Sequence, residues 1–107
     1  MDRKAEPRNL MLRNLISSIL IYEKVTTTKA KAKAVQPLVE KCITLAKKGD
    51  LTSHRKLVAI LPQKLAVKKS MEVLKDRFKH KSSGYTRLVK VGRRQGDGAE
   101  MMLIELV

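Results

Sequence analysis

Residues 85–107, YTRLVKVGRRQGDGAEMMLIELV, decide the fold of this chain. Tyr85–Val91 is rich in the β-branched and aromatic residues that favour strands, and Met101–Val107 is a second apolar segment. Between them, Gly92–Ala99 holds three glycines and is typical of a connecting loop. The stretch therefore predicts a β-hairpin that carries Arg93 and Arg94 at an exposed tip.

The residues before the hairpin are periodic at helical spacing. Leu10–Tyr22 and the segment from about residue 29 to 48 each place apolar residues on one face, which is typical of amphipathic helices. Tyr22–Thr27 lies between them and is β-prone because Val25 stands among threonines. Thr28 can accept a hydrogen bond from the first turn of the following helix. The opening pattern is helix, short strand, helix.

The second helix contains one irregular residue and a clear end. Pro37 predicts a kink or a restart, while Gly49 supplies the left-handed residue that commonly ends a helix. A short helix over about 52–61 follows, and Pro62 separates it from a longer one. The expected core face of that longer helix consists of Val67, Met71, Leu74 and Phe78. The predicted class is α+β, with helices packed on a small three-stranded mixed sheet that includes the C-terminal hairpin.

The composition limits the chemistry that this fold can perform. With 24 Lys and Arg against 10 Asp and Glu, the formal charge is +14, a self-repulsion that bound phosphates would neutralise. A hydrophobic content of 43% in 107 residues suits one modest core, so we expect a single domain over residues 1–107 with a short basic N-terminus. The apolar residues near the start are too few and too interrupted for a membrane span.

Cysteine and histidine do not indicate a metal or redox site. Cys42 is the only cysteine, so no intramolecular disulfide can form, and its place on a predicted apolar face indicates an inert buried thiol. His54 and His80 are too far apart in sequence to complete a zinc site with it. We therefore expect a cytosolic chain without metal, cofactor or catalytic group.

The positive charge is concentrated toward the end of the chain. From Arg77 to Gln95 there are seven Lys or Arg residues and no Asp or Glu. Because this run includes the predicted hairpin, folded backbone would hold its charge in a fixed arrangement. A polyanion of fixed shape, nucleic acid above all, is the expected partner.

The candidate nucleic-acid contacts are ranked by side-chain chemistry. Arg87, Arg93 and Arg94 come first, because a guanidinium can bind phosphate with two hydrogen bonds and can stack on a base. For the two loop arginines the alternative is a solvated loop, and Glu105 is expected to face solvent or Arg87. The remaining candidates are Arg3, Lys4, Arg8, Arg13, Lys31, Lys33, His54, Arg55, Lys81, Tyr85 and Lys90. For Tyr85 a packing role is favoured over stacking on a base, and the shortage of aromatic residues argues against a reader of single strands.

Several motifs follow one another in a fixed order along the chain. In the first half they are Leu12-Arg13-Asn14-Leu15, Thr26-Thr27-Thr28 followed by Lys31-Ala32-Lys33, and Leu45-Ala46-Lys47-Lys48-Gly49-Asp50-Leu51. In the last third they are Ser83-Gly84-Tyr85-Thr86-Arg87, Arg93-Arg94-Gln95-Gly96-Asp97-Gly98-Ala99 and Ile104-Glu105-Leu106. In order and spacing these motifs resemble the signature of bacterial large-subunit ribosomal protein seventeen, from about Met11 to Val107.

The resemblance implies a small protein with helices against a three-stranded sheet that binds large-subunit (23S) ribosomal RNA and has no catalytic activity. It implies a place in the cytoplasm, on the solvent side of the large ribosomal subunit toward the polypeptide exit, beside other large-subunit ribosomal proteins. No membrane or small-molecule partner is implied, and the free chain is expected to be monomeric. The role would be structural, in support of translation.

Two departures from the family pattern limit what can be carried over. The family usually has a longer Arg-, Lys- and His-rich extension before the first helix, whereas here about ten residues are expected to precede it, and they include Asp2 and Glu6. Ala34 stands where the family usually has Glu after Lys-Ala-Lys. Contacts made through the extension are therefore not assigned to this chain.

Two other classes of function remain as alternatives. The charge alone allows a nucleoid-type DNA-binding protein, although no recognition-helix motif is evident. A small enzyme acting on an anionic substrate would need a convergent set of acid, base, nucleophile or metal ligands, and the sequence offers none. RNA binding is the preferred interpretation.

Overall fold

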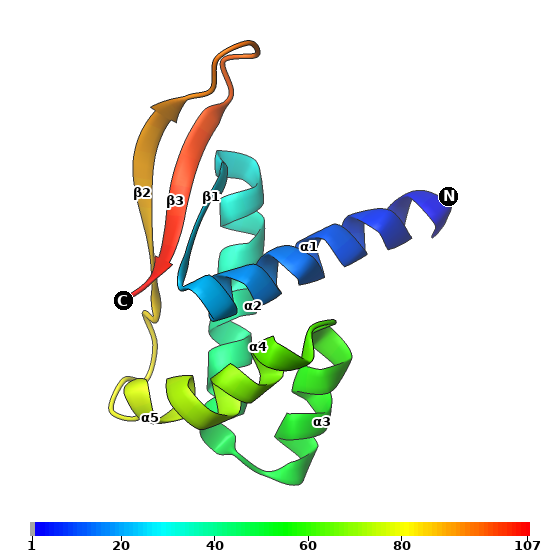
Figure 1. The fold of residues 1–107 in the computed structure, drawn as a ribbon, viewed down its shortest axis with the longest axis vertical. Coiled ribbons are helices and arrows are strands. Elements are labelled where there is room, and N and C mark those ends of the chain that lie inside the picture. Colours follow the sequence, from blue (N-terminus) through cyan, green and yellow to red (C-terminus); the bar gives the residue numbers. More distant parts are fainter. Residues whose placement is uncertain (1) are drawn as a thin grey trace.

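The computed structural model describes residues 2–107, with side chains described from residue 10 onward. The expected α+β class is confirmed: helices pack against a small three-stranded sheet (Figure 1). In chain order the elements are α1 (Asp2–Tyr22), β1 (Lys24–Thr28), α2 (Lys29–Lys48), α3 (Leu51–Ile60), α4 (Lys64–Lys69), the π-helical turn η1 (Ser70–Leu74), α5 (Lys75–Arg77), β2 (Thr86–Arg93) and β3 (Glu100–Leu106).

The sheet is entirely antiparallel, so the expectation of a mixed sheet was wrong. Its strand order is β1-β3-β2, and β3 runs antiparallel to both neighbours. β1 and β2 do run in the same direction, but they lie on opposite sides of β3 and do not pair. β3 occupies the centre because it is the most apolar of the three strands, and a central strand is covered by neighbours on both edges.

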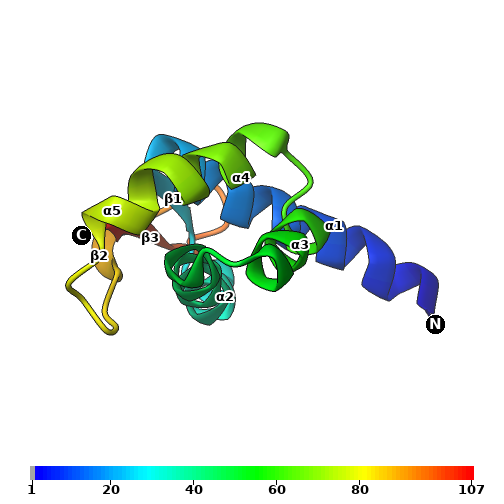
Figure 2. The same ribbon diagram turned by 90° about the horizontal axis from the view of Figure 1, so that it is seen from below.

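One face of the sheet packs on the helices and completes the core. Ile104 in β3 pairs with Val25 in β1 and with Leu88 in β2, and this row points toward the helices. Figure 2 shows α2 on one side of the molecule and α4 and α5 on the other, with the sheet at one end. The core includes Phe78 and Cys42, both buried as the sequence predicted.

The hairpin is longer than expected because β2 contains a bulge. The pairing register shifts between Lys90 and Gly92, so Val91 is the extra residue, and Gly92 adopts φ 108°. A bulge of this kind bends the strand without ending it. Pairing consequently continues to Arg93, and the loop spans residues 94–99 instead of beginning at Gly92.

The second helix has the predicted bounds. The side-chain oxygen of Thr28 accepts a hydrogen bond from the backbone of Lys31, and Gly49 ends the helix with φ 68°. The helix is continuous through Pro37, so the predicted restart is absent. Pro37 and Lys33, whose carbonyl loses its intrahelical donor, are both exposed, and water can replace the missing bond.

The first helix begins earlier than the sequence suggested. Residues from Asp2 onward are helical, so the ten residues expected to precede the helix belong largely to it. Pro7 lies beyond the first turn of α1, so its missing backbone N–H leaves the carbonyl of Arg3 without its intrahelical donor.

After Pro62, α4, η1 and α5 form one continuous helical segment with a π-helical turn in its middle. The hydroxyl of Ser70 donates to the carbonyl of Ala66, and the amide of Lys75 reaches back five residues to the carbonyl of Ser70. The wider turn changes which side chains face the core. Ser70 is buried and Met71 is only half-buried, whereas the sequence placed Met71 in the core.

Candidate nucleic-acid interface

Carboxylates neutralise only part of the positive charge. Among the side chains of residues 10–107, six cations form ion pairs, and these are Lys29, Lys69, Arg77, Arg87, Arg93 and Arg94. The other lysines and arginines of this part of the chain have no carboxylate from residues 10–107 within 4.0 Å. These unpaired cations are therefore the first candidates for contacts with phosphate.

Arg87, the first of the leading candidates for phosphate contact, forms an ion pair with a residue of the neighbouring strand. It stands opposite Glu105 in the register, and its Nε and Nη2 donate to the same carboxylate oxygen at 2.8 and 2.5 Å. This confirms the expectation that Glu105 faces Arg87. The Arg87 side chain is still 63% exposed, so its outer edge can reach a further acceptor while Glu105 fixes its position.

The two hairpin arginines are held on an ordered turn. Arg94 donates to both carboxylate oxygens of Asp97, at 3.1 and 2.5 Å, and Asp97 also accepts from the amide of Ala99 at 3.1 Å. These bonds lower the pKa of Asp97 to about 2, so its carboxylate stays charged at neutral pH. Arg93 donates to the carbonyl of Gly98 at 2.9 Å. The tip is therefore a shaped, partly neutralised turn and not a freely solvated loop.

The hairpin and the start of α2 together form one candidate phosphate site. Lys33 and Arg93, which are 60 residues apart in sequence, line the same shallow hollow of about 620 Å³. Lys29 lies in it as well, 3.3 Å from Glu100, and that carboxylate is the only acidic group among the described residues that line the hollow. Lys90 lies beside Arg93 and Glu100 in an adjoining hollow. The region keeps a net positive charge.

A second cluster of cations is formed by one residue of α1 and one of α2. Arg13 and Lys41 line a hollow of about 320 Å³ whose other walls are apolar: Leu12, Ile16, Leu38 and Ile60. Both side chains are exposed, and neither has a carboxylate partner in the described part of the chain. Lys41 was not among the sequence candidates. The helical periodicity of α2 could have identified it, because residues 33, 37, 41, 44 and 48 recur at helical spacing and are all exposed on one face.

Tyr85 belongs to the packing and not to the interface. Its side chain is 1% exposed and its ring packs edge-on against Phe78, with centroids 5.2 Å apart. Its hydroxyl accepts from Lys47 at 2.9 Å and donates to the carbonyl of Lys81 at 3.1 Å. No face of the ring is free for a base, so we correct the sequence-based candidate set by removing Tyr85.

The remaining candidates differ in how they are held. Lys81 is exposed and donates to the carbonyl of Gly84 at 3.3 Å, which keeps it near the segment that leads into β2. Lys31 lies on the exposed side of α2, and His54 and Arg55 are exposed on α3. Arg3, Lys4 and Arg8 lie outside the residues whose side chains are described. The sequence candidates also omitted other exposed cations, among them Lys48 and Lys56.

The sequence drew attention to the cysteine, the possible metal ligands and the helix lengths, and the structure describes all three. Burial raises the pKa of the Cys42 thiol to about 11, which keeps it protonated and unreactive. Within residues 10–107, no three His, Cys, Asp or Glu side chains gather as metal ligands. None of the described helices combines the length and the apolar character that crossing a membrane requires.

The chain is similar to known proteins over its whole length. Residues 11–107 match the family described as Ribosomal protein L17. The large ribosomal subunit protein bL17 of Bdellovibrio bacteriovorus is 49% identical over 99% of this chain, which spans 59% of that longer relative. Proteins of the same name from Pelobacter propionicus and Solibacter usitatus are 46% and 50% identical over the full chain, which covers 84% and 71% of them. This chain therefore belongs to the ribosomal protein L17 family.

Proposed function

We propose that this chain is a structural constituent of the large ribosomal subunit and binds 23S ribosomal RNA through its unpaired cations. The observation that carries the proposal is the separation between paired and unpaired charge. The ion pairs on the sheet and hairpin fix Arg87, Arg93 and Arg94 in place, while α2 and α3 carry lysines and arginines without a carboxylate partner in the described chain. Phosphates are the partner that such a surface requires.

The relatives' names support the assignment to the large subunit. Each similar protein named above is called a large ribosomal subunit protein. We extend this to the present chain as one domain over residues 1–107, monomeric when free, acting in the cytoplasm beside neighbouring ribosomal proteins. Its contribution to translation is structural and involves no catalytic step, cofactor or small-molecule substrate.

Recognition would rest on shape more than on base sequence. The deep major groove of A-form RNA hides the base edges, whereas folded RNA presents phosphates in distinctive arrangements. The two hollows place cations from distant elements at fixed positions, Lys33 with Arg93 and Arg13 with Lys41. Each pair suits two phosphates that only folded RNA brings close together.

The first test is sedimentation of the tagged chain from a lysate of its own cells through a sucrose gradient, at near-physiological and at high salt. Migration with large subunits at moderate salt is the expected result. A chain that stays at the top of the gradient contradicts the proposal, and one that travels with chromosomal DNA supports the nucleoid-type alternative instead.

A second test locates the interface on α2. Lys33, Lys41 and Lys48 are changed together to alanine, and binding to large-subunit RNA is measured as a function of salt. The slope of log affinity against log salt should become less steep by roughly 0.7–0.9 for each phosphate that the variant no longer neutralises. A control in which Lys24, Lys75 and Lys79 are changed to alanine removes the same charge from other elements. Equal effects of the two triple variants would refute the α2 interface.

A further inference from the structure

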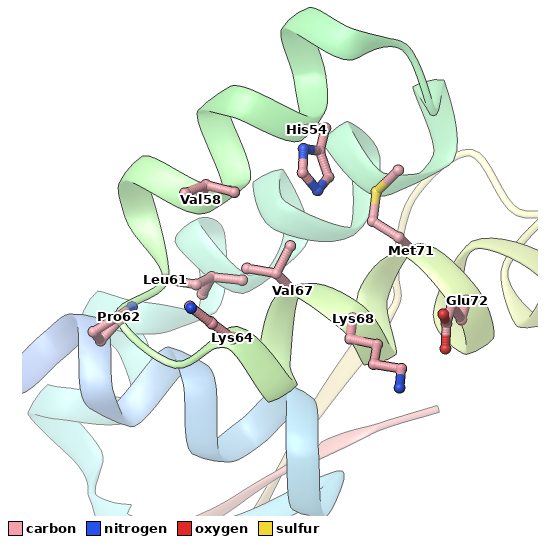
Figure 3. Close-up of a pocket in the computed structure, with 9 residues that line it drawn as sticks. All are labelled: His54, Val58, Leu61, Pro62, Lys64, Val67, Lys68, Met71 and Glu72. Carbon is pink, nitrogen blue, oxygen red and sulfur yellow. The ribbon is translucent and has the colours of Figure 1, made fainter.

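An apolar groove lies between α3 and the continuous helical segment formed by α4 and η1. It has a volume of about 580 Å³ and lies apart from the two cationic hollows described above. In Figure 3, Val58 and His54 extend from α3 on one side, Met71 extends from η1 on the other, and Leu61 and Val67 meet between them. The groove therefore has an apolar floor between two helical walls.

Local sequence explains why the groove stays open. Pro62 lies between α3 and α4 and prevents one continuous helix, so the chain changes direction after Leu61. The π-helical turn then places Ser70 in the core and leaves Met71 at the groove wall. Val58 is 53% exposed although Leu61 and Val67 beneath it are buried. Nothing within the described chain covers this apolar surface.

The rim of the groove is cationic. Lys64 and Lys68 lie one helical turn apart on α4, line the groove, and have no carboxylate partner among the described side chains. Glu72 and His54 are the other polar side chains that line it. Glu72 can accept a hydrogen bond from an exocyclic amine, and His54 has a flat ring at the groove edge.

We infer that this groove holds one unstacked base of the bound RNA, with an adjacent phosphate on Lys64 and Lys68. The inference rests on the proposed function. A base offers a flat apolar face to Val58, Val67 and Met71, while the phosphate of its backbone carries a negative charge for Lys64 and Lys68. Bases splayed out of loops and bulges are the part of an RNA that proteins contact in this manner. Charge complementarity favours a nucleotide over an apolar protein segment, which would leave both lysines without a partner.

The decisive experiment is photo-crosslinking within the assembled large subunit. A diazirine-bearing amino acid is introduced in place of Val58, and, as a matched control, in place of Val73, which is 49% exposed and does not line the groove. Position 58 is expected to crosslink to a single nucleotide of the RNA. A crosslink from position 58 to a protein would overturn the inference in favour of a protein segment, and absence of any crosslink would overturn it by showing that the groove faces solvent.

Two substitutions that introduce an uncharged polar side chain provide a second test. Val58→Asn and Val73→Asn make the same chemical change at positions of similar exposure, so neither should unfold the chain. Only Val58→Asn should increase the reactivity of that nucleotide toward a base-specific probe, and it should weaken RNA binding on the order of tenfold. Equal reactivity and affinity in both variants would refute the inference. If neither variant nor the unmodified chain enters large subunits, the proposed function itself has failed.

Discussion

Glu23 joins three parts of the fold, and its substitution gives the sharpest test of the packing described here. It is the only non-glycine residue of the described chain with positive φ, at 69°, and it lies directly between α1 and β1. Its carboxylate accepts from Lys69 at 2.9 Å and from Arg77. Its carbonyl accepts from Leu106 at 2.8 Å. A single residue therefore connects α1, the helical segment from α4 to α5, and the C-terminal strand β3.

The expected cost of Glu23→Gln follows from the exposure of these pairs. The Glu23 side chain is 36% exposed, and the lysine and arginine partners are 19% and 35% exposed. Pairs that water reaches contribute roughly 0.2–1 kcal/mol each, so removing the charge should cost about 1 kcal/mol in total. For a domain of this size that corresponds to a fall in Tm of about 4 °C. Thermal unfolding followed by circular dichroism measures it.

The contribution of Glu23 to stability should depend on pH in a definite direction. Hydrogen bonds from Arg77 and Lys69 hold the pKa of Glu23 below its ordinary value of 4.5 in the folded chain. The carboxylate therefore stabilises the fold fully above that pH, and the stabilisation is lost as pH falls through the lowered pKa. The difference between Glu23→Gln and the unmodified chain should shrink below pH 4.5. A difference independent of pH, or none at pH 7, would refute the assigned role of these ion pairs.

The backbone at this position makes a separate prediction. Glu23→Ala and Glu23→Gly remove the same ion pairs, but only glycine adopts φ 69° without steric cost. The glycine variant should therefore be the more stable of the two by about 1 kcal/mol. An alanine variant of equal or greater stability would show that the positive φ carries no strain.

Three further predictions follow from single residues. Gly49→Ala should lower the free energy of unfolding by about 1 kcal/mol in urea titrations, because alanine resists φ 68° and its Cβ would displace the flexible end of Lys75. Cys42 should not react with Ellman's reagent until the chain unfolds, since burial raises its pKa to about 11, and rapid reaction in the native state would contradict that burial. The carboxyl of Asp97 should titrate at about 2 by NMR and move toward its ordinary value of 3.8 in Arg94→Ala, and an unchanged titration would show that Arg94 is not its main partner.

Local signals predicted the fold wherever short-range chemistry decides it. Thr28 and Gly49 fixed both ends of α2, because a cap and a left-handed glycine act within one turn of the helix they bound. The bulge in β2 was missed because it depends on pairing with β3. The π-helical turn was missed for a similar reason: Ser70 bonds back to Ala66 only where tertiary packing places that side chain in the core.

The candidate site was less predictable because ion pairing is a property of the folded chain. The stretch from Arg77 to Gln95 contains no acidic residue, which favoured its arginines as free phosphate ligands. Folding brings Glu105 to Arg87 across the sheet. Asp97 follows Arg94 by three residues within one loop, so that pair could have been anticipated from sequence.

The positions of the carboxylates explain how a chain of charge +14 can hold a defined shape. Asp50 caps α3 and Glu40 accepts from the backbone amides of Gly84 and Tyr85, so these two acids satisfy backbone donors. Other carboxylates orient the arginines of the sheet and hairpin. Because so many of the described acids serve the fold in this way, few remain to neutralise the lysines of α2, and that unmatched charge is what an RNA phosphate would neutralise.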